Sequence, residues 1–141
     1  MFPNAYVLVP FRDPLQHARS LLFQHKKFSK LQKEDAFAKH YMDWLGHSEF
    51  GLSYKPTINE GLSYTNTFSL NHFLEQWHLV YSKLNESVRK LPKNNKLVCY
   101  ETLCTDKRVW NHLLEFTDIL YRPCPQFRTP SISLETAYNS A

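Results

Sequence analysis

The chain has 141 residues, the length of one ordinary domain, and its 43% hydrophobic content, with 15% aromatic residues, supplies enough apolar material for a folded core. Seventeen Lys and Arg against thirteen Asp and Glu residues give a net charge of +4, which suits an anionic ligand but is too small and too dispersed to indicate nucleic-acid binding. No run approaches the ~18–20 apolar residues of a membrane span, and the first residues lack the basic-then-apolar pattern of a signal peptide.

The three cysteines, Cys99, Cys104 and Cys124, are an odd set without a CxxC pair. This favours reduced thiols in a cytosol-like compartment over a disulfide framework, so we expect a cytoplasmic protein. The set gives no support for zinc either. Because the sequence starts almost directly on a strand of buried type, we expect both the start and the tail to be cut ends.

The first predicted elements are a strand followed directly by a helix. Residues 5–11 (AYVLVPF) form a nearly continuous apolar run, the pattern of a strand covered on both faces in a parallel sheet. Asp13 offers an N-cap and Pro14 a first helical residue. The helix is predicted to run to about Phe28, with helically spaced residues on one side: Leu15, Ala18, Leu21, Leu22 and His25.

A second helix and a long loop follow. The helix is predicted over residues 34–46 and ends at Gly46, with an aromatic and apolar face made of Phe37, Tyr41, Trp44 and Leu45. Residues 47–68 carry scattered glycines, Pro56 and Asn59, which predicts a long loop. Loops of this length in compact domains are often functional or mobile.

The second half of the chain is predicted to hold two helices and one strand. A long helix covers about residues 69–91 and is closed by Pro92, a short buried strand covers 96–100 (KLVCY), and an amphipathic helix covers 106–119. Residues 122–141 form an irregular tail. Strands alternating with helices indicate a single α/β domain over residues 1–141 with a parallel sheet.

Two strands are too few for a stable parallel sheet. We therefore expect that further short strands, a neighbouring chain or missing residues cover the open edge. An exposed strand edge also predicts self-association, with a homo-oligomer as the simplest product.

The residues most informative about function lie where the first strand meets its helix. Arg12 is placed at the carboxyl end of the strand, the crevice where open α/β sheets bind ligands, and Ser20 lies about two turns into the helix. Helix N-terminal N–H groups and a guanidinium fork both favour a phosphate there. These residues alone favour two interpretations about equally. Either they bind an anion, or Arg12 pairs with a carboxylate such as Glu101 while Ser20 faces the sheet.

Spacing adds a family resemblance to this local argument. A strand ending in Arg12, with Pro14 two residues later and Ser20 eight residues after the arginine, resembles the sulfotransferases that use 3′-phosphoadenosine-5′-phosphosulfate (PAPS). In that family the element holds the 3′-phosphate of the nucleotide. The resemblance therefore implies Arg12 and Ser20 as nucleotide ligands, PAPS as co-substrate and a P-loop-kinase-like sheet layer with flanking helices, here truncated and helix-rich.

A second part of the chain is similar to the same family. The long helix containing Trp77 leads to a strand ending Tyr100-Glu101-Thr102-Leu103, and a helix with a Leu-Leu-x-Phe pattern follows at 113–116. Together the two parts cover roughly residues 5–120. Tyr100 and Glu101 are expected to be structural, because Tyr supplies apolar bulk with one hydrogen bond and Glu can orient an arginine.

The sequence also departs from the family pattern. The family's Pro-Lys-x-Gly-Thr-type loop for the 5′-phosphosulfate occurs nowhere in the 141 residues, and the glycines are too dispersed to build another phosphate loop. The family's Gly-x-x-Gly-x-Trp-Lys stretch is also absent, leaving Arg128, Ser131 and Ser133 as its only conceivable substitutes. The catalytic base is unassigned, with His17, His25 and His47 as weak candidates, and no histidine pair has a zinc-like partner set.

The resemblance implies transfer of a sulfuryl group from PAPS to a hydroxyl acceptor, with this chain supplying the part that binds the 3′-phosphate. The acceptor is expected near loop 47–68, whose aromatic side chains suit a phenol or a sugar: Phe50, Tyr54, Tyr64 and Phe68. The main alternative is a non-catalytic nucleotide-binding or interaction module. A third is an unrelated α/β protein, such as a kinase-like fragment, that favours ATP or a nucleoside phosphate.

Overall fold

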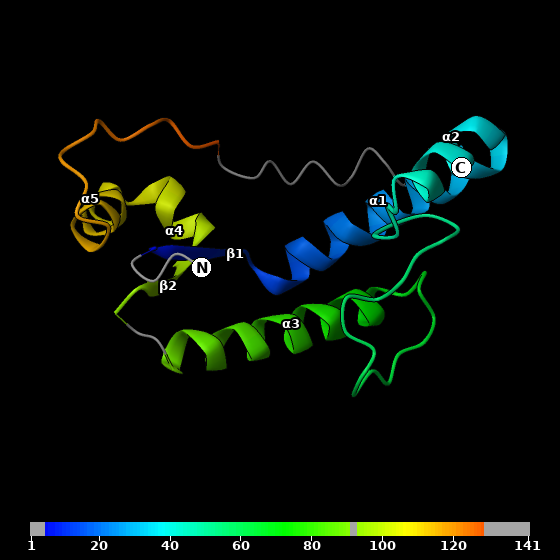
Figure 1. Cartoon of the computed structure of the whole chain (residues 1–141), viewed down its shortest axis with the longest axis horizontal. Coiled ribbons are helices and arrows are strands. Elements are labelled where there is room, and N and C mark those ends of the chain that lie inside the picture. Colours follow the sequence, from blue (N-terminus) through cyan, green and yellow to red (C-terminus); the bar gives the residue numbers. More distant parts are fainter. Residues whose placement is uncertain (1–4, 91–92, 129–141) are drawn as a thin grey trace. The chain divides into compact units, whose positions relative to one another are not determined.

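The computed structural model describes residues 5–90 and 93–128 as a mostly helical α/β chain with one two-stranded parallel sheet. Its elements follow in the order β1 (Val7–Phe11), α1 (Pro14–Glu34), α2 (Ala36–Trp44), α3 (Leu70–Lys90), β2 (Asn95–Cys99), α4 (Tyr100–Thr105) and α5 (Lys107–Phe116) (Figure 1). The chain forms two compact units. One contains Met1–Arg12 and Ser87–Ala141, and the other contains Asp13–Glu86.

The sheet of the first unit confirms the predicted parallel pairing. β1 and β2 run in register from Val7 opposite Asn95 to Phe11 opposite Cys99. The expectation that the first strand is covered on both faces is wrong, because Val7 is 48% exposed and Leu8 is 40% exposed. A sheet of two strands has too little flanking structure to cover both faces of each.

Three apolar side chains of the described part of the first unit are buried. They are Val98 of β2 and Leu113 and Leu114 of α5. Tyr6, just before β1, meets Phe116 edge-on with ring centroids 5.3 Å apart. The Leu-Leu-x-Phe pattern therefore serves packing in this unit.

The short helix α4 was not predicted. The second strand was expected to reach Tyr100, but it ends at Cys99, and Tyr100–Thr105 is helical. Because β1 ends at Phe11, opposite Cys99, no strand residue remains to pair with Tyr100. An acidic residue in the first turn, Glu101, also favours a helix start. The final helix, predicted over residues 106–119, covers Lys107–Phe116. Asp106 is its N-cap, and its carboxylate accepts from the Arg108 N–H at 2.9 Å.

In the second unit, α1 begins as predicted and ends later than predicted. Asp13 Oδ1 accepts a hydrogen bond from the Gln16 N–H at 2.8 Å, and Pro14 is the first helical residue. The helix continues past Phe28 to Glu34, because residues 29–34 contain neither Gly nor Pro. It ends at Asp35, whose carboxylate accepts from the N–H groups of Phe37 and Ala38 and so starts α2.

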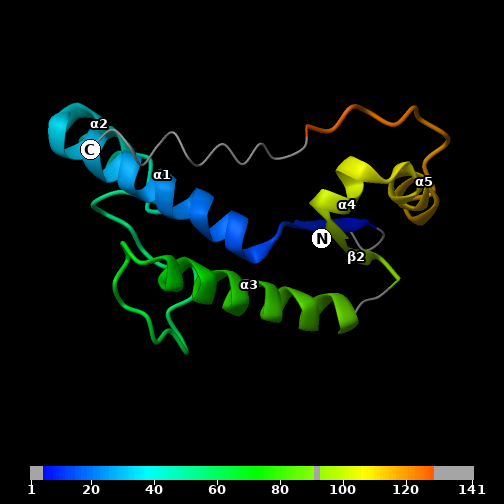
Figure 2. The ribbon, with the colours of Figure 1, turned by 180° about the vertical axis from the view of Figure 1, so that it is seen from behind.

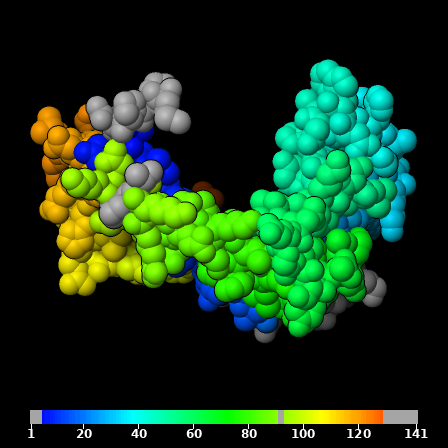
Figure 3. Space-filling model, turned by 60° about the horizontal axis from the view of Figure 1, so that its bottom comes forward, coloured from blue at the N-terminus to red at the C-terminus, as the bar shows by residue number. Residues whose placement is uncertain are grey.

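The face of α2 predicted from its aromatic spacing exists but points to solvent. Phe37 is 71% exposed and Trp44 is 74% exposed. Tyr41 stacks between them, with ring centroids 5.8 Å from Phe37 and 6.2 Å from Trp44. Gly46 has φ of +73°, which confirms its predicted role in ending the helix. Figure 3 shows the atoms of α2 (cyan) and of the start of the following loop (teal) as one continuous surface.

The core of the second unit contains both apolar and polar buried side chains. Helices α1 and α3 lie side by side (Figures 1 and 2), and Ala18, Leu22 and Phe73 form a buried apolar cluster between them. The other buried side chains of these helices are polar: His25, Ser29, Gln32, His72 and Gln76. Buried polar groups are stable only when they are hydrogen-bonded, so their partners explain this arrangement.

Most of these partners lie in the backbone of the predicted loop, which contains no helix or strand between Trp44 and Leu70. Gln32 Oε1 accepts from the Leu52 N–H at 2.6 Å. Gln76 makes two bonds to Ile58, accepting from its N–H at 3.2 Å and donating to its carbonyl at 2.6 Å. The Glu75 carboxylate accepts from the N–H groups of Ser63 and Tyr64. The helices thus hold the loop by side-chain-to-backbone bonds.

Gly51 is a loop position where a side chain would strain the backbone and displace Gln32. Its φ is +88°, and an added Cβ would collide with the side chain of Gln32. Gly51→Ala should lower the free energy of unfolding in urea by about 1–3 kcal/mol, combining backbone strain with the loss of the Gln32 contact. Gly46→Ala is the matched control, since φ is +73° there with open space around the position. Equal losses for the two variants would contradict the steric argument.

The exposed sheet leads to a second prediction. Because both strands are edges and Leu8 is exposed, the apparent mass in light scattering should rise with protein concentration. Leu8→Lys should reduce this rise by adding like charges at the edge. Leu120→Lys, at a position 88% exposed and outside the sheet, should leave it unchanged. A monomer at every concentration would exclude edge-mediated association.

Candidate functional site

The carboxyl ends of the two parallel strands bring together the residues singled out in the sequence from the first unit. Arg12 directly follows β1, and Tyr100 and Glu101 directly follow β2. Since Phe11 and Cys99 are register partners, these residues leave the sheet side by side. This is the edge at which parallel sheets place ligand-binding residues.

Arg12 lies beside one carboxylate and one aromatic ring at this edge. Its Nε is 3.8 Å from Glu101 Oε1, and its guanidinium carbon is 6.0 Å from the centre of the Tyr100 ring. The Nε atom is buried and makes no hydrogen bond within the described part of the chain, while 33% of the side-chain surface is exposed. The arginine is therefore loosely paired, and part of it faces solvent.

Glu101 and Tyr100 are held by their own neighbours. The Cys99 thiol donates to Glu101 Oε2 at 3.5 Å, and the Tyr100 hydroxyl donates to the Arg128 carbonyl at 3.0 Å. A hydrogen bond with Cys104, together with burial, raises the pKa of the Tyr100 hydroxyl. It therefore stays protonated at neutral pH and remains a donor. These contacts fit the expected structural role of both residues.

The remaining residues expected in the site are placed as follows. Ser20 lies on α1 in the second unit and is half-buried. Arg128 approaches the strand ends through its backbone carbonyl, which accepts from Tyr100 and from the Cys104 thiol. Ser131 and Ser133 fall outside the described residues.

The predicted acceptor aromatics mainly pack within the second unit. Tyr54 and Phe68 lie against His25, with ring centroids 4.9 Å and 4.6 Å away. Phe50 stacks on Phe28 at 6.1 Å. Tyr64 is 51% exposed. Of the four, Tyr64 is therefore the most exposed to an external ligand.

The weak candidates for a catalytic base are spread over different surroundings. His47 lies beyond the end of α2, and its Nδ1 is 3.5 Å from Glu49 Oε2. His17 is 6.4 Å from the Tyr81 ring, and His25 is buried. Within residues 5–90 and 93–128 no three His, Cys, Asp or Glu side chains form a metal-binding group.

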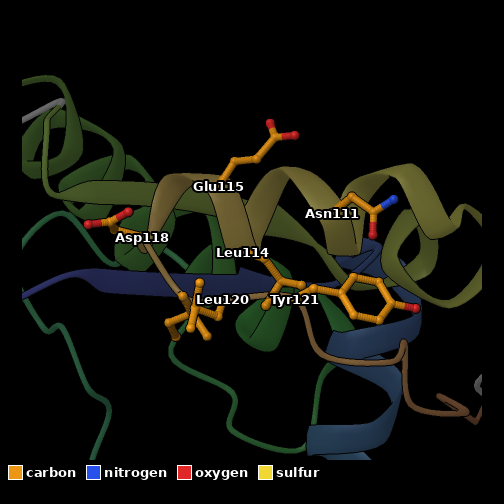
Figure 4. A pocket seen from close by; sticks show the side chains of 7 residues that line it. Asn111, Leu114, Glu115, Asp118, Leu120 and Tyr121 are labelled. Carbon is orange, nitrogen blue, oxygen red and sulfur yellow. The ribbon is translucent and has the colours of Figure 1, made fainter.

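Two pockets lie away from Arg12 and Ser20. One of about 330 Å³ lies in the first unit along α5, and another of about 530 Å³ lies in the second unit between the end of α2 and the loop. Figure 4 shows the first, with Leu114, Leu120 and Tyr121 on one side of the helix while the Glu115 carboxylate points to the other. Neither pocket is lined by Arg12 or Ser20.

The second pocket is lined by both polar and apolar side chains. Its residues are Asp43, Gly46, His47, Ser48, Leu52, Ser53, Tyr54 and Lys55. Hydrogen bonds from Lys39 and Ser53 hold the pKa of Asp43 below its usual value, so its carboxylate is ionised at neutral pH and pairs with the Lys39 ammonium 2.6 Å away.

Sequence reasoning missed the polar residues that hold the loop. His72, Glu75 and Gln76 lie on α3, which corresponds to the long helix predicted over residues 69–91. The sequence did contain a signal for them, because these polar residues recur at helical spacing beside Phe73, which is buried. His25 gave a similar signal, since it occupies a buried position among the apolar residues of α1. Such positions indicate that a buried face has polar partners.

No protein-family model, curated protein or solved structure matches the chain. Among the described helices, none combines the length and apolarity needed to cross a bilayer.

Proposed function

We propose that this chain is the nucleotide-binding C-terminal part of a sulfotransferase-like protein with a P-loop-kinase-like sheet layer. In this proposal Arg12 binds the 3′-phosphate of PAPS, and Ser20 is the second ligand that the resemblance implies. The donor passes its sulfuryl group to a hydroxyl acceptor. The supporting observation is that Arg12 and Tyr100-Glu101 emerge together from the carboxyl ends of two neighbouring parallel strands.

The chemistry of the Arg12 side chain suits this role. A guanidinium presents several N–H donors in one plane and binds phosphate oxygens through two parallel hydrogen bonds. The Arg12 Nε has no hydrogen-bond partner among the described residues, and its nearest recorded carboxylate oxygen is 3.8 Å away. A phosphate with better geometry can therefore compete for the side chain.

Sulfuryl transfer needs more than this contact. In-line attack requires positioned reactants, cations or N–H groups around the phosphosulfate, and a base for the acceptor hydroxyl. Arg12 and Ser20 supply binding energy at the far end of the donor, which positions it. They do not touch the group that moves.

A second candidate is a non-catalytic nucleotide-binding or interaction module derived from this fold. The Arg12–Glu101 ion pair favours it, because this is the pairing expected if the arginine is structural. The absence of a Lys-x-Gly-Thr phosphosulfate loop from the sequence favours it as well.

Calorimetric titration with 3′-phosphoadenosine-5′-phosphate, with AMP as the comparison ligand, tests the nucleotide assignment. We expect binding that requires the 3′-phosphate. The affinity should fall at least about tenfold in Arg12→Ala, because this variant loses charge-assisted hydrogen bonds to the phosphate. Arg108→Ala removes a cation from the same unit at a side chain 84% exposed, and it should bind like the wild type. Absence of binding by a folded chain would refute the assignment.

Glu101→Gln separates the two roles of Arg12. If Arg12 binds phosphate, removing the adjacent negative charge should raise the affinity for the bisphosphate by about two- to tenfold. If the ion pair is only structural, the same variant should leave nucleotide binding absent and lower the midpoint of urea unfolding. The two measurements on one variant therefore distinguish ligand binding from scaffolding.

A further inference from the structure

The buried histidine His25 joins α1 to the loop in a way that depends on its protonation. The side chain is 1% exposed and lies among the rings of Tyr54, Phe68 and Phe73. Its Nδ1 accepts a hydrogen bond from the backbone N–H of Gly51 at 3.3 Å. This bond links residues 26 positions apart in the sequence.

The Gly51 contact fixes the state of the imidazole. A backbone N–H can only donate, so Nδ1 must present its lone pair and the neutral ring carries its hydrogen on Nε2. A second proton would have to go onto Nδ1, where it would face the Gly51 N–H. Protonation of His25 is therefore incompatible with this anchor of the loop.

The neighbouring His72 lacks this constraint. Its Nδ1 is 2.6 Å from the Tyr64 carbonyl, which can only accept, so Nδ1 carries a hydrogen. Its Nε2 is 2.9 Å from the Tyr54 hydroxyl, which can either donate or accept by rotating its hydrogen. A proton on His72 would preserve both contacts, and His25 is thus the ring whose charge breaks a bond.

We propose that His25 is a proton sensor that holds the segment Gly51–Tyr54 on α1 when neutral and releases it when protonated. The segment includes the wall of the 530 Å³ pocket formed by Leu52, Ser53 and Tyr54. Acidification therefore loosens this wall of the pocket at Gly51, while Gln32 continues to hold the Leu52 N–H. The device is independent of nucleotide binding at Arg12.

The electrostatic surroundings set the direction of the response. Burial, followed by the nearby His72, lowers the pKa of His25 below its usual 6.5. A histidine with a lowered pKa in the folded state stabilises that state fully above 6.5, and this stabilisation is lost as the pH falls below 6.5 towards the lowered value. The titratable groups facing His25 are Tyr54 from the loop and His72 from α3.

Other titrating groups near the loop respond elsewhere on the pH scale. Burial raises the pKa of Tyr54, which therefore stays neutral throughout this window. Backbone N–H groups of Tyr64 and Ser63 lower the pKa of Glu75, and Lys39 and Ser53 lower that of Asp43. Both carboxylates therefore remain charged between pH 7.5 and pH 5.

Amide hydrogen exchange read by NMR between pH 7.5 and pH 5 tests the sensor, after correction for the intrinsic pH dependence of exchange. As the pH falls below 6.5, the equilibrium constant for opening at the Gly51 amide should rise by up to about tenfold per pH unit. Tenfold per unit is the limit when opening is coupled to the uptake of one proton. The Ile58 amide, held by Gln76 rather than by a histidine, is the internal reference and should change less.

His25→Asn is the informative variant, because an amide oxygen can replace Nδ1 as acceptor and cannot gain a proton. Its Gly51 exchange should show no pH step. His78→Asn, at an exposed position of α3, should keep the wild-type step. If the variant fails to fold, ¹⁵N chemical shifts of the wild-type His25 ring give the answer directly. A hydrogen on Nδ1 at pH 7.5, or ring protonation without faster Gly51 exchange, would overturn the proposal.

Discussion

A long stretch of backbone without helix or strand needs hydrogen-bond partners, and this requirement shapes the second unit. Between Trp44 and Leu70 no strand is available to pair with the chain. Helices α1 and α3 supply side chains instead, and the two-bond contact of Gln76 with Ile58 imitates the exchange between neighbouring strands. The inner surface of the helix pair is therefore half polar, and loop and helices stabilise each other.

This arrangement leaves some polar atoms without recorded partners. His25 Nε2 and Ser29 Oγ are buried and make no hydrogen bond within residues 5–90 and 93–128. An unpaired buried polar group costs about 1–3 kcal/mol, and α3 carries the same kind of cost at Trp77 Nε1.

The sequence was most informative where a structural signal lies within a few residues. Asp13 and Pro14 mark the start of α1, and the run from Lys96 to Cys99 marks a strand, because capping and strand patterns are local. Contacts between distant parts of the chain could not be predicted from the sequence. The bonds from Gln32 and Gln76 to the loop span 20 and 18 positions, and nothing near either glutamine identifies its partner.

The candidate site shows the same division. The placement of Arg12 at a strand end followed from local pattern, and its pairing with Glu101 was one of two alternatives weighed from sequence. The end of β2 at Cys99 could not be predicted from its own residues, because it is set by where β1 ends. The start of α4, and with it the position of Tyr100, depends on that distant limit.

Asp35 closes α1 and opens α2 with a single residue, its N–H bonded to Leu31 and its carboxylate to the first turn of α2. Because no linker separates the two helices, a change in chain length at this joint directly alters the orientation of α2. One inserted residue would turn α2 by about 100° about its axis, moving its aromatic row to another side. Insertions and deletions during evolution are therefore expected to avoid this joint and to collect at exposed positions of the loop such as Asn59.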